Sequence, residues 1–218
     1  MQEMIVPPKL NFGVEYFKVA SAEDEQLLCA QVETVLTKTQ YEEVTGDIDG
    51  TQAAIKSNKG KHLMLFNDQS GSMSGTPFET LKKACLDLGE VIFSADGDKS
   101  RNVFEKVHTI FYNHVAHPTM TDDKAAYLQH IQSNYVTGGT DFCPCFDVLA
   151  KTVKEHAQEG SEFVVMFFTD GQGNSDDQRL QQLNKLFKEQ QQSKNVTVTI
   201  YSIGFSAYHD AELLNKLA

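Results

Sequence analysis

The sequence predicts an α/β fold in which a doubly wound, mostly parallel sheet is covered by helices on both faces. From Lys61 onward, short apolar runs alternate with longer amphipathic stretches, the order expected when a helix follows each strand. Some of these runs contain almost no polar residue, as is typical of strands buried on both faces. The chain has 218 residues and is 40% hydrophobic, which suffices for one sizeable core. Together these observations indicate a Rossmann-like arrangement.

The first half of this region is expected to hold three strands and two helices. Lys61–Phe66 is an apolar run and predicts a buried strand. Pro77–Ile92 predicts a helix, because proline favours the first helical turn and apolar residues then recur at helical spacing. Val107–Tyr112 predicts the second strand, and Asn113–His117 predicts a short hairpin partner that forms an antiparallel edge. Asp122–Ser133 again has helical periodicity.

The second half continues the alternation of helices and strands. Phe146–Ala157 is helical in pattern, and Phe163–Phe168 is rich in Val and Phe, as a fully buried strand would be. Asp176–Gln190 predicts a polar helix with its leucines on one face, and Val196–Ile203 predicts a strand because it contains several β-branched residues. Asp210–Leu217 predicts the start of a last helix.

Residues 1–60 have a different pattern from the remainder of the chain. Val14–Val19 alternates like a strand, whereas Glu25–Leu36 fits either a strand or a helix. The Val and Thr content of Glu25–Leu36 favours a hairpin. We predict that residues 1–60 are an N-terminal extension of β type ending in a linker, and that residues 61–218 are the main domain.

Composition excludes several classes of function. The formal net charge is −11, so duplex nucleic acid and anionic membrane surfaces are not expected as main partners. No apolar run is long enough to span a bilayer, and the N-terminus lacks the pattern of a signal peptide. The four cysteines do not form the paired knuckles of a ring-finger zinc site. We therefore expect an intracellular, cytoplasmic protein with free thiols and no membrane insertion.

A tight turn rich in side-chain oxygens follows the first predicted strand. Asp68, Ser70 and Ser72 are spaced two residues apart, directly after the buried run that ends at Phe66. Hard oxygen atoms on a short loop suit Mg²⁺, Mn²⁺ or Ca²⁺. Because two of the three residues are neutral hydroxyls, a bound ion would keep much of its charge. Such an ion would attract an anion from elsewhere.

Two further oxygen-bearing residues lie beside other predicted strand ends. Thr140 comes just after the pair Gly138-Gly139, and Asp170 directly follows the run Phe163–Thr169. In open parallel sheets, ligands bind in the crevice outside the carboxyl ends of the strands. We therefore expect Thr140 and Asp170 to converge with the turn at Asp68.

These three motifs, in this order, resemble those of the von Willebrand factor type A (VWA) domain. The motifs are Asp68-Gln69-Ser70-Gly71-Ser72-Met73, Gly138-Gly139-Thr140-Asp141 and Phe168-Thr169-Asp170-Gly171. The resemblance runs from about Lys61 to the C-terminus, which makes residues 61–218 a VWA-like domain. It is similar to VWA domains of intracellular proteins that also carry a ring finger, although this chain has none.

The resemblance implies an intact metal-ion-dependent adhesion site that holds one divalent cation. Ser70 and Ser72 would bind the ion directly, Thr140 directly or through water, and Asp68 and Asp170 through bound waters. Mg²⁺ is the expected ion, with Mn²⁺ or Ca²⁺ as alternatives. A protein partner would supply Asp or Glu to the open coordination position. The loop residues expected to contact this ligand are Gly71, Met73, Gly139, Asp141 and Gly171.

The leading hypothesis is therefore a binding module and not an enzyme, with two alternatives. In the first, the domain regulates or recruits substrates for a larger enzyme system such as a ubiquitin ligase. In the second, the metal assists hydrolysis, with Asp68 or Asp170 as general base. A serine hydrolase is excluded, because Met73 occupies the nucleophile position of the motif-like Gly71–Gly75.

Several nearby residues have ordinary structural interpretations. Asp141 is expected to cap the following helix, and Cys143-Pro144-Cys145 to place small, buried residues at its start. His108, His114 and His117 lie around one predicted strand or hairpin and could cluster, but ordinary core or surface placement is the expectation.

Overall fold

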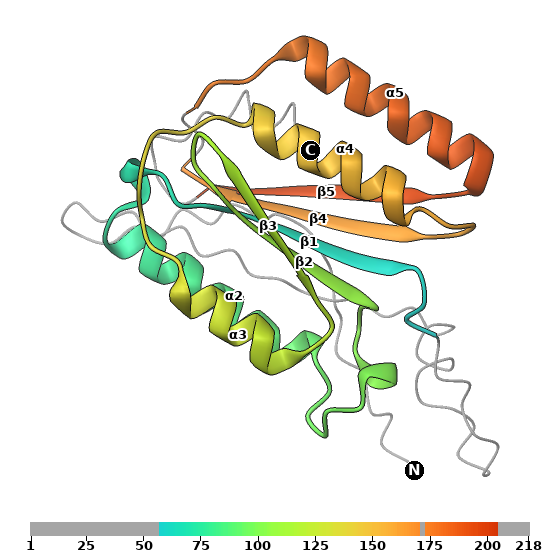
Figure 1. The fold of residues 1–218 in the computed structure, drawn as a ribbon, viewed down its shortest axis with the longest axis horizontal. Helices are drawn as coiled ribbons and strands as arrows, with labels where there is room; N and C mark the ends of the chain where they lie inside the picture. Colours follow the sequence, from blue (N-terminus) through green and yellow to red (C-terminus); the bar gives the residue numbers. More distant parts are fainter. Residues whose placement is uncertain (1–56, 171–172, 205–218) are drawn as a thin grey trace, which may run out of the picture. The chain divides into compact units, whose positions relative to one another are not determined.

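The computed structural model describes residues 57–170 and 173–204. Figure 1 shows a twisted sheet with helices on its two faces. The strands are β1 (Lys61–Asp68), β2 (Lys106–Tyr112), β3 (Ala116–Thr121), β4 (Glu162–Thr169) and β5 (Thr197–Gly204). The α-helices are α2 (Thr76–Ile92), α3 (Lys124–Ser133), α4 (Cys143–His156) and α5 (Asp177–Lys194), and η1 (Gly71–Met73) and η2 (Lys99–Arg101) are short 3₁₀ turns.

The sheet has the strand order β3-β2-β1-β4-β5. β1 pairs in parallel with both β2 and β4, and β4 pairs in parallel with β5. β3 pairs antiparallel with β2 at one edge. The predicted fold class, a mostly parallel doubly wound sheet with an antiparallel edge strand, is confirmed.

The two faces of β1 contribute to two separate cores. Leu63 and Leu65 pack in the cluster that includes α2 and α3, whereas Met64 and Phe66 pack in the cluster that includes α4 and α5. Successive side chains of a strand point to opposite faces, so a strand covered on both sides must be apolar at every position. This requirement explains the uninterrupted apolar run in the sequence.

The edge strand begins later than the sequence pattern predicts. Asn113 lies in the turn instead, where its backbone N–H donates to the carbonyl of Val115 and its Oδ1 accepts from the Val115 N–H. The strand then runs from Ala116 to Thr121 and contains Pro118. Proline is tolerated there because an edge strand leaves part of its backbone without a ladder partner.

The remaining elements agree with the predicted ones to within a few residues at each end. Asp176 caps α5, where its carboxylate accepts from the N–H groups of Gln178 and Arg179. The predicted last helix, Asp210–Leu217, and nearly all of the predicted extension at residues 1–60 lie outside the described residues. No helix among the described residues is long and apolar enough to cross a membrane.

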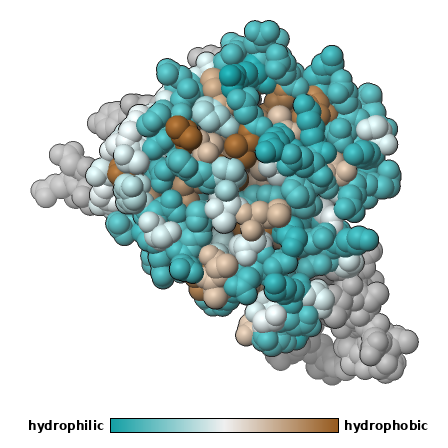
Figure 2. Space-filling view, in the orientation of Figure 1, coloured by the Kyte–Doolittle hydropathy of each residue, from teal (hydrophilic) through white to brown (hydrophobic). Residues whose placement is uncertain are grey.

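The visible surface is mainly hydrophilic, with hydrophobic residues interspersed among polar ones (Figure 2). Among the residues that the structure describes, the exposed large hydrophobic ones lie on different elements and loops, at Val91, Val103, Val115, Met120 and Tyr135. Isolated residues of this kind are normal on a globular domain.

Three histidines meet at the end of the sheet where β1 and β2 begin. His62 of β1 and His108 of β2 are buried, and their Nδ1 and Nε2 atoms lie 3.1 Å apart. The ring of His156, the last residue of α4, lies 5.5 Å from that of His62 and 5.4 Å from that of His108. Burial, together with the charge of His156, lowers the pKa of His62 to about 4. Burial and the other two histidines lower the pKa of His108 to about 3.

This pair is expected to make the domain acid-sensitive. Above pH 6.5 both imidazoles are neutral in the folded and unfolded chain, whereas below it the unfolded chain takes up protons that the folded chain does not. The free energy of unfolding should therefore fall as the pH drops from about 6.5 toward 4, by on the order of 2 kcal/mol for each of the two histidines at pH 5. Urea denaturation at pH 7.5 and 5.0 measures this change in the free energy of unfolding. A His62→Gln/His108→Gln variant should lose this part of the pH dependence, and an unchanged dependence would contradict the assignment.

Candidate functional site

Asp68 is the last residue of β1 and lies fully buried at the carboxyl end of the sheet. Its Oδ1 accepts from the backbone N–H of Ser70 at 2.9 Å, and its Oδ2 accepts from the Thr169 hydroxyl of β4 at 2.7 Å. Burial raises the pKa of Asp68, the bonds from Ser70 and Thr169 lower it, and the charge of Asp170 raises it further. The result is a raised pKa for a carboxyl whose two oxygens are both held by donors.

The turn after Asp68 brings two hydroxyls together. The Ser70 and Ser72 Oγ atoms lie 3.0 Å apart. Met73 closes the short η1 turn and is fully buried in the cluster beneath α2 and α3. Met73 therefore anchors the turn, while Gly71 and Ser72 stay exposed.

The second motif lies directly against this turn. The Gly71 N–H donates to the Gly138 carbonyl at 2.8 Å, and the Thr137 N–H donates to the Gln69 carbonyl at 2.7 Å. The Asn113 amide donates to the Thr137 carbonyl at 2.9 Å from the β2–β3 turn. The structure thus brings residues 69–71 and 137–138 side by side, as the convergence of strand ends predicts.

Thr140 and Asp141 continue this loop into α4. Asp141 Oδ1 accepts from the Cys143 N–H at 2.8 Å, so this carboxylate pairs with the first N–H of α4. The N-cap position itself is held by Phe142, one residue later than the sequence predicts. The Asn174 N–H donates to the Thr140 carbonyl at 3.3 Å, and Asp141 and Asn174 form an isolated parallel bridge. The residues after β4 are therefore held against the Thr140 loop.

Asp170 follows β4 and is buried. Its charge contributes to the raised pKa of Asp68. Gly171 lies outside the described residues, and Gly139 is exposed in the loop that carries Thr140. The predicted site residues that the structure describes thus lie on three loops at the carboxyl end of the sheet.

The side chains available as metal ligands at this end of the sheet are chiefly hydroxyls. Across residues 57–170 and 173–204, no three His, Cys, Asp or Glu side chains are placed as a ready group for one ion. A cation bound here would depend on Ser and Thr oxygens and on water, with the two carboxylates behind them. Hard neutral oxygens of this kind fit Mg²⁺, which keeps several of its waters in proteins.

Sequence reasoning missed the residues that join the loops. The Gln69 N–H donates to the end of β2 and its carbonyl accepts from Thr137, while the side-chain amide of Asn113 donates to Thr137. The Thr169 hydroxyl of the neighbouring strand donates to Asp68. Asn113 could have been noticed, since asparagine is frequent in turns. Its bond to Thr137 joins residues 24 positions apart and has no local signal.

Gly138 and Gly139 should differ sharply in their tolerance of alanine. Gly138 has φ +77°, and a Cβ there would lie 2.8 Å from His114 Nδ1, whereas a Cβ at Gly139 would meet nothing within 4 Å. Gly138→Ala should therefore lower the free energy of unfolding by about 1–2 kcal/mol, and Gly139→Ala should change it little. Urea denaturation of both variants tests this. Equal effects would show that the loop tolerates the strain.

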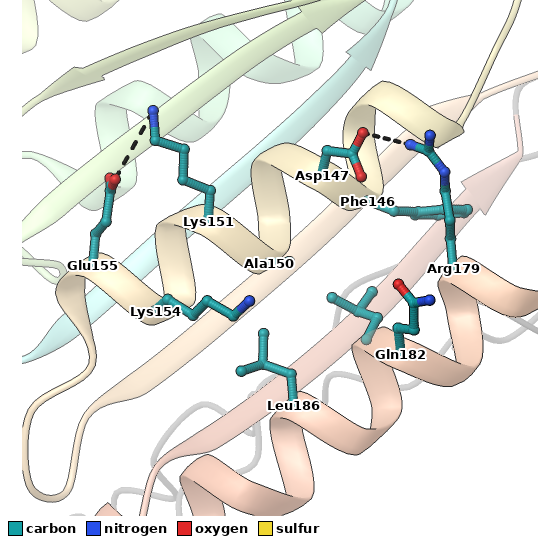
Figure 3. Close-up of a pocket in the computed structure, with 10 residues that line it drawn as sticks. Phe146, Asp147, Ala150, Lys151, Lys154, Glu155, Arg179, Gln182 and Leu186 are labelled. Carbon is teal, nitrogen blue, oxygen red and sulfur yellow. Dashed lines mark hydrogen bonds and ion pairs between the residues drawn. The ribbon is translucent and has the colours of Figure 1, made fainter.

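A groove of about 430 Å³ lies elsewhere, between α4 and α5 (Figure 3). Its charged lining residues largely pair with one another: Arg179 donates to Asp147, and Lys151 lies 3.9 Å from Glu155. The side chains converge on no common point, so this groove offers no comparable set of ligands.

Comparisons with known proteins agree with the fold. The family model described as von Willebrand factor type A domain matches residues 62–218. No curated protein matches the chain.

Three solved structures illustrate the similarity. A von Willebrand factor type A structure from Catenulispora acidiphila has a TM-score of 0.51 at 14% identity, covering 72% of this chain and 36% of that one. Proximal thread matrix protein 1 from the mussel byssus, solved with a zinc-occupied MIDAS motif, has a TM-score of 0.50 at 17% identity, covering 72% and 39%. BatB from Bacteroides thetaiotaomicron has a TM-score of 0.45 at 15% identity, covering 66% and 65%. At such identities the likeness concerns the fold, and the chain spans less than two thirds of each of these proteins.

Proposed function

The chain belongs to the von Willebrand factor type A domain family, and from this membership we propose that it is a divalent-cation-dependent protein-binding module. Domains of this family are often metal-dependent interaction modules. The proposed ligand set is Asp68, Ser70, Ser72, Thr140 and Asp170, which would form an intact metal-ion-dependent adhesion site. The setting we propose is intracellular, as for the ring-finger VWA proteins that the motifs resemble.

One observation carries this proposal: the paired hydroxyls of Ser70 and Ser72 lie beside the Thr140 loop, in front of the buried Asp68. Direct ligands would be the neutral hydroxyls, and Asp68 and Asp170 would hold coordinated waters. Because little negative charge would touch the ion, it would remain electrophilic and would favour a carboxylate from outside.

The proposed partner is a protein that presents Asp or Glu at an exposed position. The cation would take one oxygen of that side chain at its open coordination position. Gly71 and Gly139, which are exposed, would leave room for the approaching chain, and we propose the same role for Gly171 from its place in the motif. Mg²⁺ is the proposed ion, with Mn²⁺ or Ca²⁺ as alternatives. A role in recruiting substrates for a larger enzyme system is compatible with the same mode of binding.

Cation binding itself is tested by titrating Mn²⁺ and counting free ion by electron paramagnetic resonance. One Mn²⁺ per chain should bind, and Mg²⁺ should compete for it. Ser70→Ala/Ser72→Ala should weaken this binding by at least ~10-fold. Ser74→Ala is the matched control, because Ser74 is exposed just beyond the paired hydroxyls. Equal Mn²⁺ affinity in both variants would refute the ligand set.

Partner recognition needs a separate measurement. An array of peptides that differ only in Asp, Glu, Asn or Gln at one position should retain the protein in Mg²⁺ and release it in EDTA. Retention should require the acidic residue and should be lost in Ser70→Ala/Ser72→Ala. Turnover of phosphoester or peptide substrates that depends on Ser70 would instead favour metal-assisted hydrolysis.

A further inference from the structure

We propose that Tyr112 is a positioning residue of the cation site, whose hydroxyl donates a hydrogen bond to Thr169 once a cation is bound and thereby fixes the Asp68 carboxylate. This role rests on the proposed function, because it concerns the same site. Tyr112 is the last residue of β2 and is not one of the proposed ligands. It would act on the ion only through Thr169 and Asp68.

The three residues form a row across the carboxyl end of the sheet. Tyr112 of β2 is the register partner of Asp68 in β1, and Thr169 of β4 donates to Asp68 Oδ2 at 2.7 Å from the other side. Adjacent strands lie about 4.8 Å apart, and register partners in parallel strands point to the same face. That face is the one covered by α4, where Tyr112 packs in the cluster that contains Phe66 and Phe167.

The Tyr112 side chain is fully buried, yet its hydroxyl makes no hydrogen bond to any residue that the structure describes. Tyr127, which is buried to the same degree, shows the ordinary arrangement, because its hydroxyl donates to the Cys85 carbonyl at 2.7 Å. A buried polar group without a partner destabilises a fold, and in native proteins such a group usually has a functional reason. A bond that forms in the cation-bound domain would be such a reason.

Contacts of the backbone and the ring connect Tyr112 to the two loops that carry the proposed direct ligands. Its carbonyl accepts at 2.8 Å from the N–H of Gln69, which begins the turn with the paired serines. Its ring lies 5.6 Å from that of Phe142, the N-cap of α4, two residues after Thr140. A small adjustment of either loop when an ion binds would therefore reach Tyr112 directly.

The chemistry of the row suits a chain of hydrogen bonds that ends on Asp68. The Thr169 hydroxyl gives its proton to Asp68, and a hydroxyl oxygen can also accept. Burial raises the pKa of Tyr112 well above its usual value, and the charge of Asp68 raises it further, so the phenol stays protonated and able to donate. Hydrogen bonds in such a chain strengthen one another, so a donor at Tyr112 would hold the carboxylate more firmly behind the coordinated waters.

Tyr112→Phe removes only the hydroxyl and separates its two effects. In EDTA the midpoint of urea denaturation should be unchanged or higher, because the variant loses a buried hydroxyl that has no partner. The affinity for Mn²⁺, measured by electron paramagnetic resonance, should fall by about 5-fold, the effect of one hydrogen bond made only in the bound state. A merely structural hydroxyl would instead lower the urea midpoint and leave the Mn²⁺ affinity unchanged.

Tyr127→Phe is the matched control, because it removes a buried hydroxyl that is hydrogen-bonded and belongs to the cluster on the other face of the sheet. It should lower the urea midpoint and leave the Mn²⁺ affinity unchanged. Thr169→Val tests the route, since it lacks the intermediate hydroxyl. In that background, Tyr112→Phe should cause no further loss of Mn²⁺ affinity.

The outcomes separate this role from the proposed function. Equal Mn²⁺ affinity in Tyr112→Phe and the parent would overturn the role of Tyr112 while leaving the ligand set intact. Equal losses in Tyr112→Phe and Tyr127→Phe would overturn it too, as would a lower urea midpoint of Tyr112→Phe in EDTA or an undiminished effect in Thr169→Val. If Thr169→Val does not fold, the comparison of the two tyrosine variants decides. A parent that binds no Mn²⁺ would refute the proposed function and the role of Tyr112 with it.

Discussion

Asp68→Asn is expected to stabilise the cation-free domain while abolishing cation binding. The folded structure raises the pKa of Asp68, chiefly by burial, so the ionised carboxylate is disfavoured in the fold at neutral pH. Asparagine removes this cost, and its carbonyl can still accept from the Ser70 N–H. Because the Thr169 hydroxyl can rotate to accept from the new amide, both contacts of residue 68 have a counterpart in the variant.

The gain should appear as a higher free energy of unfolding at pH 7. It should shrink as the pH falls, because Asp68 then takes up its proton and the parent protein loses the same cost. Mn²⁺ affinity should fall by ~100-fold, since the variant lacks the charge behind the coordinated waters. Urea denaturation without metal, combined with Mn²⁺ titration, measures the two effects on the same preparation.

Asp87→Asn provides the control for a general effect of charge. Asp87 is exposed on α2, and its replacement removes one negative charge from a chain whose net charge is −11. It should leave both stability and Mn²⁺ affinity almost unchanged. A destabilised Asp68→Asn domain would show that the carboxylate serves the fold and is not held there at a cost.

Phe167→Ala should produce the largest loss of stability among simple core substitutions. Phe167 of β4 is fully buried and stacks on Phe66, its register partner in β1, with ring centroids 4.5 Å apart and an interplanar angle of 11°. Its ring also lies 6.5 Å from that of Phe142, next to α4. Removing it leaves a cavity between the sheet and α4, so the free energy of unfolding should fall by about 3–5 kcal/mol.

Chemical denaturation compares this variant with Tyr135→Ala, which truncates an aromatic residue that is 73% exposed. The exposed substitution should cost less than about 0.5 kcal/mol. A loss below about 1 kcal/mol for Phe167→Ala would mean that the surrounding side chains collapse into the space, contrary to the expectation for a fully buried ring.

The succession of strands and helices could be predicted because each element shows its burial in its own sequence. β1 and β4 are apolar on both faces, and the leucines of α5 recur at helical spacing. The edge strand β3 was displaced in the prediction, because His117, Pro118 and Thr119 are exposed and give no apolar alternation. An edge strand is specified by pairing with its neighbour, which the sequence pattern does not express.

The residue types of the candidate site could be predicted, whereas the hydrogen bonds that hold its loops together could not. Asp68, Ser70 and Ser72 are close in sequence, so their spacing is itself the signal. The histidines show the opposite case. The sequence places His108 near His114 and His117, whereas the fold brings it to His62 and His156. Strand order and helix placement determine such contacts, and neither can be predicted from the local sequence.

The bonds that join the loops have a consequence for amide hydrogen exchange. The N–H groups of Gln69, Gly71 and Thr137 lie outside the strands, yet each donates to a carbonyl on another segment, 2.7–2.8 Å away. Breaking any one of them requires two segments that are distant in the sequence to separate, and not the fraying of a single turn. These three amides should therefore exchange as slowly as those of the central strands, through unfolding of much of the domain, while neighbouring exposed loop amides exchange by local opening.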